Sequence, residues 1–458
     1  MPDSSSAIVI WFRRDLRLID HPALQAAAGE ARSMGRPVVA LFVVDDGLMG
    51  SGGPNRQAYL ARTLAALDAD IGGALTLRRG RPEDVVPAVA AEVGATTVFA
   101  TGDCAPYGRR RDARVAAALT GAGRTLTRIG SPYAVAPGRV LTGGGGPYRV
   151  FTPFRRGWTA HAWPEPIGVA TGVRWASGQS DLALGDLEPD PASVTAELPA
   201  AGERAAADLV DRFLDGPVST YGDDRNRPDL DRTSRLSPHL RFGTVHPRQL
   251  LARVPPGTGG ETFRSELAWR EFYADVLWHR PDSAWVSLSP VGANLRSDTG
   301  HGADVRFDAW CEGRTGYPLV DAGMRQLRLE GWMHNRVRML VASFLIKDLH
   351  LEWQRGAAHF LDLLIDGDLA SNNFGWQWVA GTGTDAAPFY RVFSPDRQAE
   401  RFDPDGDYVN RYVPEIGTPD YADPIVDHAA ERVEALARWE EAKEAVVNGA
   451  LRTDGVTP

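Results

Sequence analysis

The sequence has very little cysteine and almost no lysine. Its two cysteines, Cys104 and Cys311, are too few and too far apart for a disulfide framework or a zinc site. Only Lys347 and Lys443 are lysines, which leaves 50 − 2 = 48 arginines, a bias typical of a GC-rich genome. No run of about 18 apolar residues is present to span a membrane, and the apolar residues 7–12 precede arginines, the reverse of a signal peptide. We therefore expect a cytoplasmic protein with neither a metal site nor a membrane segment.

Positive charge is not in excess either. The formal net charge of −9 excludes a chain coated in positive potential, so a nucleic-acid partner would need a local basic patch. The length of 458 residues allows two or three domains with substantial cores. What the chain does have in excess is tryptophan, with 13 residues, for which packing of large side chains is the simplest explanation.

The order of apolar patterns predicts an α/β domain followed by a helical one. Short apolar runs alternate with helical patterns at the start of the chain, which is typical of a parallel sheet with right-handed crossovers. The expected strands are 7–12, Val38–Val44, 76–78 and Thr97–Ala100, and the expected helices are 22–35, 55–72, 82–93 and 110–121. No Gly-x-Gly-x-x-Gly follows the first strand, so the fold carries no dinucleotide fingerprint there.

Beyond this region the composition changes twice. Residues 131–198 are rich in Pro, Gly and Ala without periodicity, which indicates a connector. Helical patterns then continue at 209–214, 247–254, 262–279, 317–329, 335–349, 354–364 and, as a charged amphipathic helix, 427–447. We predict a Rossmann-like α/β parallel-sheet domain in residues 1–130, a long linker in 131–200 and a larger all-helical domain in 201–458.

The most informative segment runs from residue 366 to residue 390. Its first thirteen residues, DGDLASNNFGWQW, hold two carboxylates, three amides and two tryptophans. This mixture is too polar for a core helix and too aromatic for an ordinary loop. It suits a pocket for a large heteroaromatic cofactor, with hydrogen bonds to the cofactor's edge and rings against its faces.

Three further motifs carry chemistry. Residues 233–238 (TSRLSP) place hydroxyls and a guanidinium before a proline, which indicates either an anion site or an ordinary capped helix start. Glu266, Trp269 and Arg270 share one helix face with Tyr273, a stripe that would make a poor core; a salt-bridged surface is the alternative.

The third motif, residues 332–339 (WMHNRVRM), puts Trp332, Asn335 and Met339 on one helix face beside Arg338. His334 by itself is more often a structural histidine than a catalytic one.

In order and spacing these motifs resemble the DNA photolyase and cryptochrome family, from residues 11–17 (WFRRDLR) to 413–415 (VPE). The closest resemblance is to the class I cyclobutane pyrimidine dimer photolyases. It implies an FAD site formed by Tyr221, Thr233, Ser234, Arg235, Leu236, Ser237, Arg270, Trp332, Asn335, Arg338, Asp366, Asp368 and Asn372. Within this set, Arg338 resembles the buried partner of Asp366, and Asn372 the amide that faces flavin N5.

The resemblance also implies a lesion pocket. Glu266 would hydrogen-bond the damaged bases, and Trp269 and Trp378 would wall the pocket. Asn335 and Met339 stand where (6-4) photolyases have histidines, and neither an amide nor a thioether can shuttle protons near neutral pH. These two residues therefore favour the cyclobutane dimer as the substrate.

An electron route and a DNA contact follow from the same resemblance. Trp376 and Trp353 match the first two members of the family's tryptophan chain, but Gly300 stands at the expected third position, for which Trp285 is a possible substitute. The basic positions that match DNA contacts are Arg225, Arg336, Arg391 and Arg401, expected to bind phosphate and not sequence.

The sequence thus predicts a monomeric deoxyribodipyrimidine photo-lyase that acts on UV-damaged DNA, single- or double-stranded, with FAD. A cryptochrome-type photoreceptor and a (6-4) photolyase are the alternatives. For a second, light-harvesting cofactor, Tyr107 and Gly108 replace the Asn-Glu pair of folate-binding members. This replacement favours an 8-hydroxy-deazaflavin over methenyltetrahydrofolate, with an empty site as the other alternative.

Overall fold

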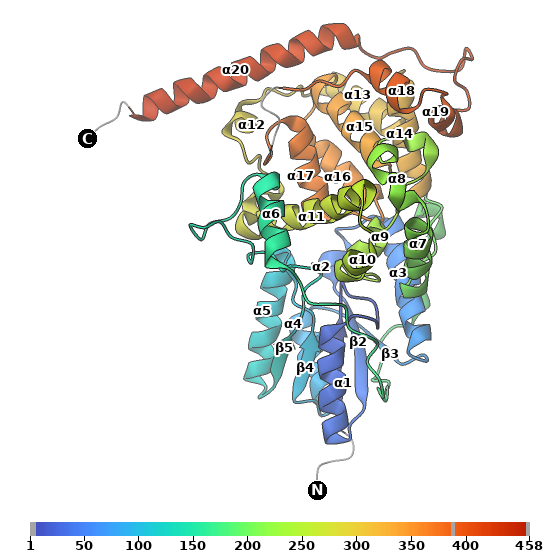
Figure 1. The fold of residues 1–458 in the computed structure, drawn as a ribbon, viewed down its shortest axis with the longest axis vertical. Coiled ribbons are helices and arrows are strands. Elements are labelled where there is room, and N and C mark those ends of the chain that lie inside the picture. The colour runs from blue at the N-terminus through green and yellow to red at the C-terminus, as the bar shows by residue number, and fades with distance from the viewer. Residues whose placement is uncertain (1–5, 386–389, 455–458) are drawn as a thin grey trace.

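The computed structural model describes residues 6–385 and 390–454 and consists of a sheet layer that carries a larger helical body (Figure 1). The five strands form one parallel sheet in the order β3-β2-β1-β4-β5. Their bounds are β1 Ile8–Phe12, β2 Val38–Val44, β3 Leu75–Arg79, β4 Thr97–Ala100 and β5 Thr125–Arg128. Every residue of β1 and β2 is buried, as expected for strands covered on both faces.

Alternate residues of the sheet pack against different helices. Ile8, Ile10 and Phe12 share a core with α1 (Pro22–Met34) and α3 (Pro54–Asp70). Val9 and Trp11 share another core with α4 (Pro82–Glu92) and α5 (Pro106–Gly121). The period of two along the strand therefore sends successive side chains to opposite helix layers. A short helix, α2, spans Asp46–Met49.

The four expected strands are present, but the sequence reasoning missed β5. This strand reads TLTR, with one aliphatic residue, and is largely uncovered. The predicted linker is also more structured than expected, since it contains α6 (Phe151–His161) and two short 3₁₀ turns, η1 (Leu184–Leu187) and η2 (Pro191–Ser193). The domain limits at residues 130 and 200 remain predictions.

Part of the linker lies along the sheet. Gly178 N donates to Thr76 Oγ1 at 2.8 Å, and Asp181 N donates to the carbonyl oxygen of Leu77 at 3.1 Å. Asp181 Oδ1 accepts from Arg79 N at 3.1 Å. Residues 178–181 therefore cover β3, which is one of the two outer strands.

The rest of the chain is helical, and the predicted helices are all present. The helices are α7 Glu203–Leu214, α8 Pro217–Asp224, α9 Ser237–Phe242, α10 Pro247–Arg253, α11 Thr258–His279, α12 Pro290–Asn294, α13 His301–Glu312, α14 Pro318–Glu330, α15 Asn335–Lys347, α16 Trp353–Leu363, α17 Leu369–Ala380, α18 Pro395–Phe402, α19 Asp407–Tyr412 and α20 His428–Asp454, with 3₁₀ turns η3 Pro228–Leu230 and η4 Pro281–Ala284. In the described ranges, no helix combines the length and apolarity needed to cross a bilayer.

Two hydrophobic cores support the helical body. One is formed mainly by residues of α6, α7, α8 and α11, and the other by residues of α14, α15, α16 and α17. In Figure 1, α11 crosses below α16 and α17. Residues of both cores line a cavity in the helical body.

Candidate functional site

A cavity of about 450 Å³ collects most of the residues predicted from the motifs. Its size lies within the range of small-molecule sites. The predicted residues that line it are Tyr221, Arg225, Ser234, Ser237, Glu266, Trp269, Arg270, Asn335, Arg338, Met339, Asp366, Asp368, Asn372, Trp376 and Trp378.

Asp368 forms a strongly charged part of the wall. It caps α17 by accepting from Ser371 N at 3.1 Å, and it accepts from the Arg14 guanidinium at 2.7 Å. Burial opposes the charge of this carboxyl, but Arg14, Arg241 and Arg270 together hold its pKa well below the usual range. Asp368 is therefore an ionised acceptor aimed into a cavity, suited to polar N–H or O–H groups of a ligand.

Asp366 lies in the turn before α17 and pairs with Arg338 of α15. The two guanidinium nitrogens of Arg338 lie 2.8 and 3.3 Å from the carboxylate oxygens, and its Nε donates to Met333 O at 2.7 Å. The carboxylate is 3% exposed. Nearby, Asn372 Nδ2 donates to Ala357 O at 3.1 Å, which fixes the amide at the wall.

The opposite wall comes from the stripe on α11. Glu266 accepts from Arg225 at 2.5 Å, and burial raises the pKa of this carboxyl while Arg225 opposes the rise. Trp269 stacks on Phe151 of α6, with 3.7 Å between the ring centroids. Arg270 donates to the carbonyl oxygens of Pro132 and Leu240 at 3.2 and 3.1 Å while lining the cavity.

The hydroxyl motif divides between the cavity and the structure behind it. Ser234 and Ser237 line the cavity, and Ser237 Oγ accepts from Trp332 Nε1 at 3.1 Å. Thr233 itself does not line the cavity, and its buried hydroxyl has no hydrogen-bond partner in the described part of the chain. An orphaned hydroxyl beside two cavity-lining serines is the arrangement expected where a phosphate-bearing ligand completes the hydrogen bonds.

Arg235, Leu236 and Trp332 do not line the cavity. The Arg235 guanidinium pairs with Asp231 at 2.7 Å and Glu330 at 2.8 Å and lies 4.3 Å from the Trp332 ring centroid. Leu236 is a core residue at 1% exposure. These three residues support the wall from behind, in positions that the motif alone did not reveal.

The basic positions predicted to bind DNA lie close to one another. Burial, followed by Arg225, Arg401 and Arg391, lowers the pKa of Arg336 to about 10. Arg336 also lies over Phe402, as does Arg401. The net negative chain thus carries a local basic cluster beside Glu266 and the cavity.

Comparisons with known proteins decide the family. The model described as DNA photolyase matches residues 8–169, and the model described as FAD binding domain of DNA photolyase matches residues 263–418. A protein of Streptomyces griseus named deoxyribodipyrimidine photo-lyase is 44% identical over 96% of this chain and 99% of its own length. The chain belongs to the DNA photolyase family.

Other photolyase relatives agree. An Escherichia coli protein of the same name is 36% identical over 95% of this chain and 99% of its own length. A class III photolyase from Agrobacterium tumefaciens has a TM-score of 0.87 and 34% identity, covering 97% of this chain and 99% of its own. A Synechocystis cryptochrome has a TM-score of 0.83 and 25% identity, covering 95% and 99%. The class I resemblance remains a prediction.

Within this photolyase fold, Trp376 contacts aromatic rings that the predicted electron route did not include. Its ring centroid lies 6.1 Å from that of Trp310 and 5.1 Å from that of Phe360. A Cβ at Gly356 would lie 2.1 Å from the Trp376 ring, so only glycine fits there. Gly356 and Trp353 lie on the same helix, α16.

The distal end of the expected tryptophan route differs from the family pattern. Gly300 caps α13 with a φ of 83°, and Trp353 Nε1 donates to Ser287 Oγ at 3.2 Å. The exposed Trp285 lies near this end of α16, where its carbonyl oxygen accepts from Gln354 Nε2 at 3.3 Å.

A second cavity of about 430 Å³ lies between the sheet domain and the helical body. It shares the wall residues Arg241, Gly367 and Asp368 with the first cavity. Tyr107 donates to Asp45 at 2.7 Å, and burial together with Asp45 raises the pKa of Tyr107 to about 12. At Gly108 a Cβ would lie 2.1 Å from the Asp103 carboxylate, so a glutamate cannot stand there without rearrangement.

Proposed function

We propose that the chain repairs cyclobutane pyrimidine dimers in UV-damaged DNA under blue light, with FAD as its cofactor. The proposal rests on one observation: residues predicted to bind the cofactor and residues predicted to bind the lesion line the same cavity. The acceptors and donors expected for the cofactor, Asp366, Asp368 and Asn372, face the same space as the lesion residues Glu266 and Met339. The names of the curated relatives and the matched FAD-binding model support the same reading.

The residues fit FAD in chemistry. The ionised Asp368 would accept from the flavin's ring edge, the orphaned Thr233 hydroxyl with Ser234 and Ser237 would bind the phosphates, and Asn372 would face N5. When bound and reduced, FAD supplies the light-excited electron that opens the cyclobutane ring. The protein's part is to hold the cofactor and the lesion together and to exclude water.

Among the described residues on the lesion side, Asn335 and Met339, which stand where (6-4) photolyases have histidines, offer no proton shuttle near neutral pH. Asn335 Nδ2 and Met339 Sδ lie 3.9 Å apart at the mouth. The neighbouring His334 is held neutral, since burial followed by Arg336, Arg235 and Arg338 lowers its pKa to about 3. A cyclobutane dimer needs an electron and no such proton, so these residues favour it over the (6-4) lesion.

The remaining roles follow from the positions of the side chains. Glu266, poised on Arg225, would accept from the damaged bases, and Trp269, Trp378 and Met339 would wall a flipped-out dinucleotide. We assign the basic cluster of Arg225, Arg336, Arg391 and Arg401 to phosphate contacts on single- or double-stranded DNA. Trp376 and Trp353 are proposed to carry electrons that regenerate the reduced cofactor.

For the second cavity we propose an 8-hydroxy-deazaflavin as the light-harvesting group. A solved Sulfolobus tokodaii photolyase, with a TM-score of 0.82 and 27% identity over 95% of this chain and 99% of its own, is described with two FAD molecules, which are said to imply a novel light-harvesting cofactor. The Asp103 carboxylate against Gly108 disfavours the acid of folate-binding members. We further propose that the chain acts as a monomer. We also propose that it acts in the cytoplasm, a reducing compartment that suits its two free thiols.

Repair of an oligonucleotide with one cyclobutane thymine dimer tests the proposal. Enzyme reduced with dithionite should remove the dimer in blue light and not in the dark. A parallel oligonucleotide with one (6-4) lesion should stay unrepaired. Bound flavin with an untouched dimer would contradict the proposal and favour a cryptochrome-type photoreceptor, whereas repair of the (6-4) lesion alone would reassign the substrate.

A further inference from the structure

The chain segment that carries Arg391 is held by a buried lysine. Lys347, at the end of α15, is 2% exposed, and its ammonium donates a hydrogen bond to the carbonyl oxygen of Arg391. The same Nζ lies 4.4 Å from the ring centroid of Tyr390. Burial lowers the pKa of Lys347 to about 7, against the opposing effect of Asp348. Lys347 is one of only two lysines in the chain. Burying its amino group costs free energy unless hydrogen bonds and ring contacts compensate, and here those contacts are made with residues 390 and 391.

Tyr390 is also held from α20. Trp439 stacks on its ring with 4.3 Å between centroids and an interplanar angle of 7°. Gly381, which follows α17, lies against both rings: a Cβ there would lie 3.2 Å from the Tyr390 ring and 3.3 Å from the Trp439 ring. Elements from three parts of the helical domain, α15, α17 and α20, therefore meet around one tyrosine.

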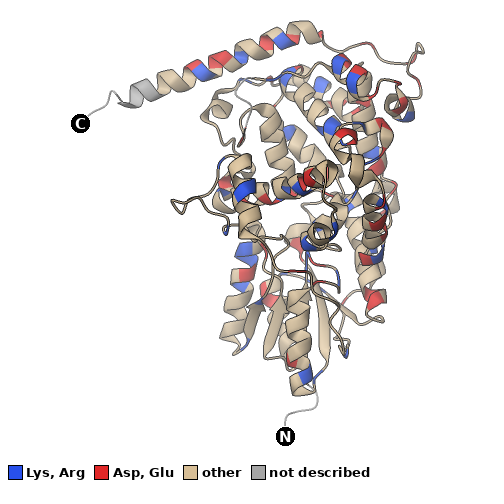
Figure 2. Cartoon of the chain, in the orientation of Figure 1, with Lys and Arg blue, Asp and Glu red and all other residues tan. Residues whose placement is uncertain are grey.

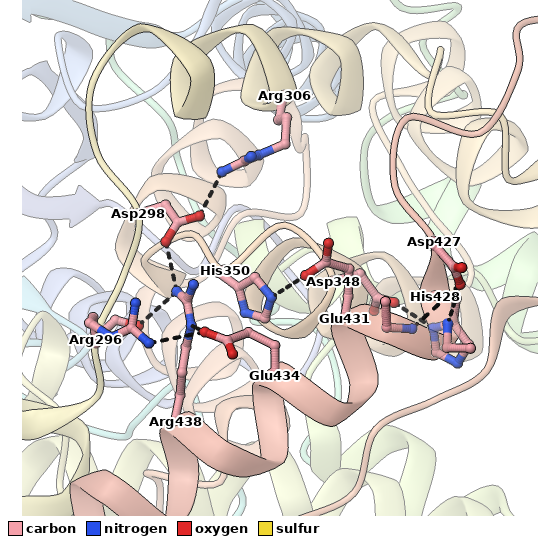
Figure 3. Close-up of polar contacts among 12 residues, drawn as sticks. Arg296, Asp298, Arg306, Asp348, His350, Asp427, His428, Glu431, Glu434 and Arg438 are labelled. Carbon is pink, nitrogen blue, oxygen red and sulfur yellow. Dashed lines mark hydrogen bonds and ion pairs between the residues drawn. The ribbon is translucent and has the colours of Figure 1, made fainter.

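The helix that presents Trp439 is itself anchored by ion pairs (Figure 3). Arg438, the preceding residue, pairs with Asp298 and Glu434 at 2.7 Å each. The His350 ring lies 2.7 Å from Glu431, and His428 pairs with Asp348. Figure 2 shows charges of both signs along the rest of α20, whose far end projects away from the body. The position of Trp439 is therefore fixed within the part of α20 that contacts the helical domain.

These contacts offset the electrostatic repulsion between the arginines of the basic cluster. Arg391 lies close enough to Arg336 to help lower its pKa, together with Arg225 and Arg401. Like charges at short range repel, so side chains on a free segment would move apart. Arg391 stays near the others because its backbone is bonded to Lys347 and its neighbour Tyr390 is packed on Trp439.

We propose that Trp439 and Lys347 are positioning residues for DNA binding, which hold Tyr390 and thereby keep Arg391 within the basic cluster for a phosphate contact. By this inference α20, which follows all the predicted cofactor-binding residues in the sequence, contributes to DNA binding. The inference rests on the proposed DNA-repair function.

The test is dark binding of flavin-loaded protein to a fluorescent duplex with one thymine dimer, measured by anisotropy at several salt concentrations. Trp439→Ala should raise Kd about eightfold at 0.1 M salt and reduce the slope of log K against log salt by about 0.9, the values for one lost phosphate contact on duplex DNA. Arg391→Ala should do the same. The double variant should bind no more weakly than Arg391→Ala alone, because both substitutions remove the same phosphate contact.

Three controls separate positioning from folding. Trp439→Phe keeps a ring on Tyr390 and should bind like the wild type, as should Val433→Ala, which alters a residue of α20 that is 65% exposed. Lys347→Met removes the hydrogen bond to Arg391 without touching α20 and should reproduce the loss of slope. Wild-type affinity and slope in Trp439→Ala and Lys347→Met, or effects that add fully to that of Arg391→Ala, would overturn the inference. Failure of the wild type itself to bind the dimer would instead refute the proposed function.

Discussion

Replacing Arg338 by methionine should destabilise the protein strongly because it leaves the Asp366 carboxylate buried without the guanidinium that pairs with it. The carboxylate is 3% exposed and meets the guanidinium through two contacts, at 2.8 and 3.3 Å. Loss of one partner of a buried pair costs about 3–5 kcal/mol, and the 24% exposure of the Arg338 side chain favours the lower figure. A further 1 kcal/mol or so comes from the lost hydrogen bond to Met333.

Urea unfolding of the flavin-free protein at pH 7, followed by circular dichroism, measures this loss. The matched variant Arg338→Met/Asp366→Asn removes the charge as well as its partner and should recover all but about 1–1.5 kcal/mol, the share of the Met333 hydrogen bond. The denaturant slope should be the same in all three proteins, so that midpoints compare directly. A single variant within 1 kcal/mol of the wild type, or a double variant as unstable as the single one, would refute the reasoning.

Three further outcomes are expected. Glu266→Ala should lower single-turnover repair by dithionite-reduced enzyme about 10- to 150-fold at unchanged FAD content, the loss of one charge-assisted hydrogen bond, and unchanged repair would remove Glu266 from lesion binding. Trp376→Phe should block light-driven flavin reduction, seen by absorbance, but not repair by chemically reduced enzyme; normal photoreduction would contradict the electron route. Burial lowers the pKa of His239 and His359 to about 4 and of His334 to about 3, below the ordinary value near 6.5 of the unfolded chain. The stability that each of these neutral histidines contributes is therefore present above pH 6.5 and lost as pH falls. In urea unfolding, His359→Leu should reduce the stability lost between pH 7.5 and 5.5 by about 1.3 kcal/mol relative to the wild type.

The sheet was predictable where burial on both faces gave continuous apolar runs, as in Val38–Val44. β5 was not, because an outer strand with only Leu126 as an aliphatic side chain gives no such run. In α6, Phe151, Phe154 and Trp158 do carry helical spacing, but Pro153 and Gly157 hide it.

At the candidate site, the motifs located the side chains that come from one helix or one turn. They could not show partners from distant parts of the chain. Arg14 and Arg241, which help keep Asp368 ionised, lie far from it in sequence, and no local pattern links them. Arg235 shows the converse: its motif was recognised, but its positive φ of 48° and two carboxylate partners turn it away from the cavity.

The linker's contacts with β3 determine where a truncated fragment of this protein can end without exposing that strand. A fragment that stops at residue 130 would lack Ser180 and Asp181, which now bind the backbone of Leu77 and Arg79. The uncovered outer strand would then offer its N–H and C=O groups to other chains, a known route to aggregation. A soluble stand-alone sheet domain should therefore be cut after residue 181, some fifty residues beyond the point at which the composition of the sequence changes.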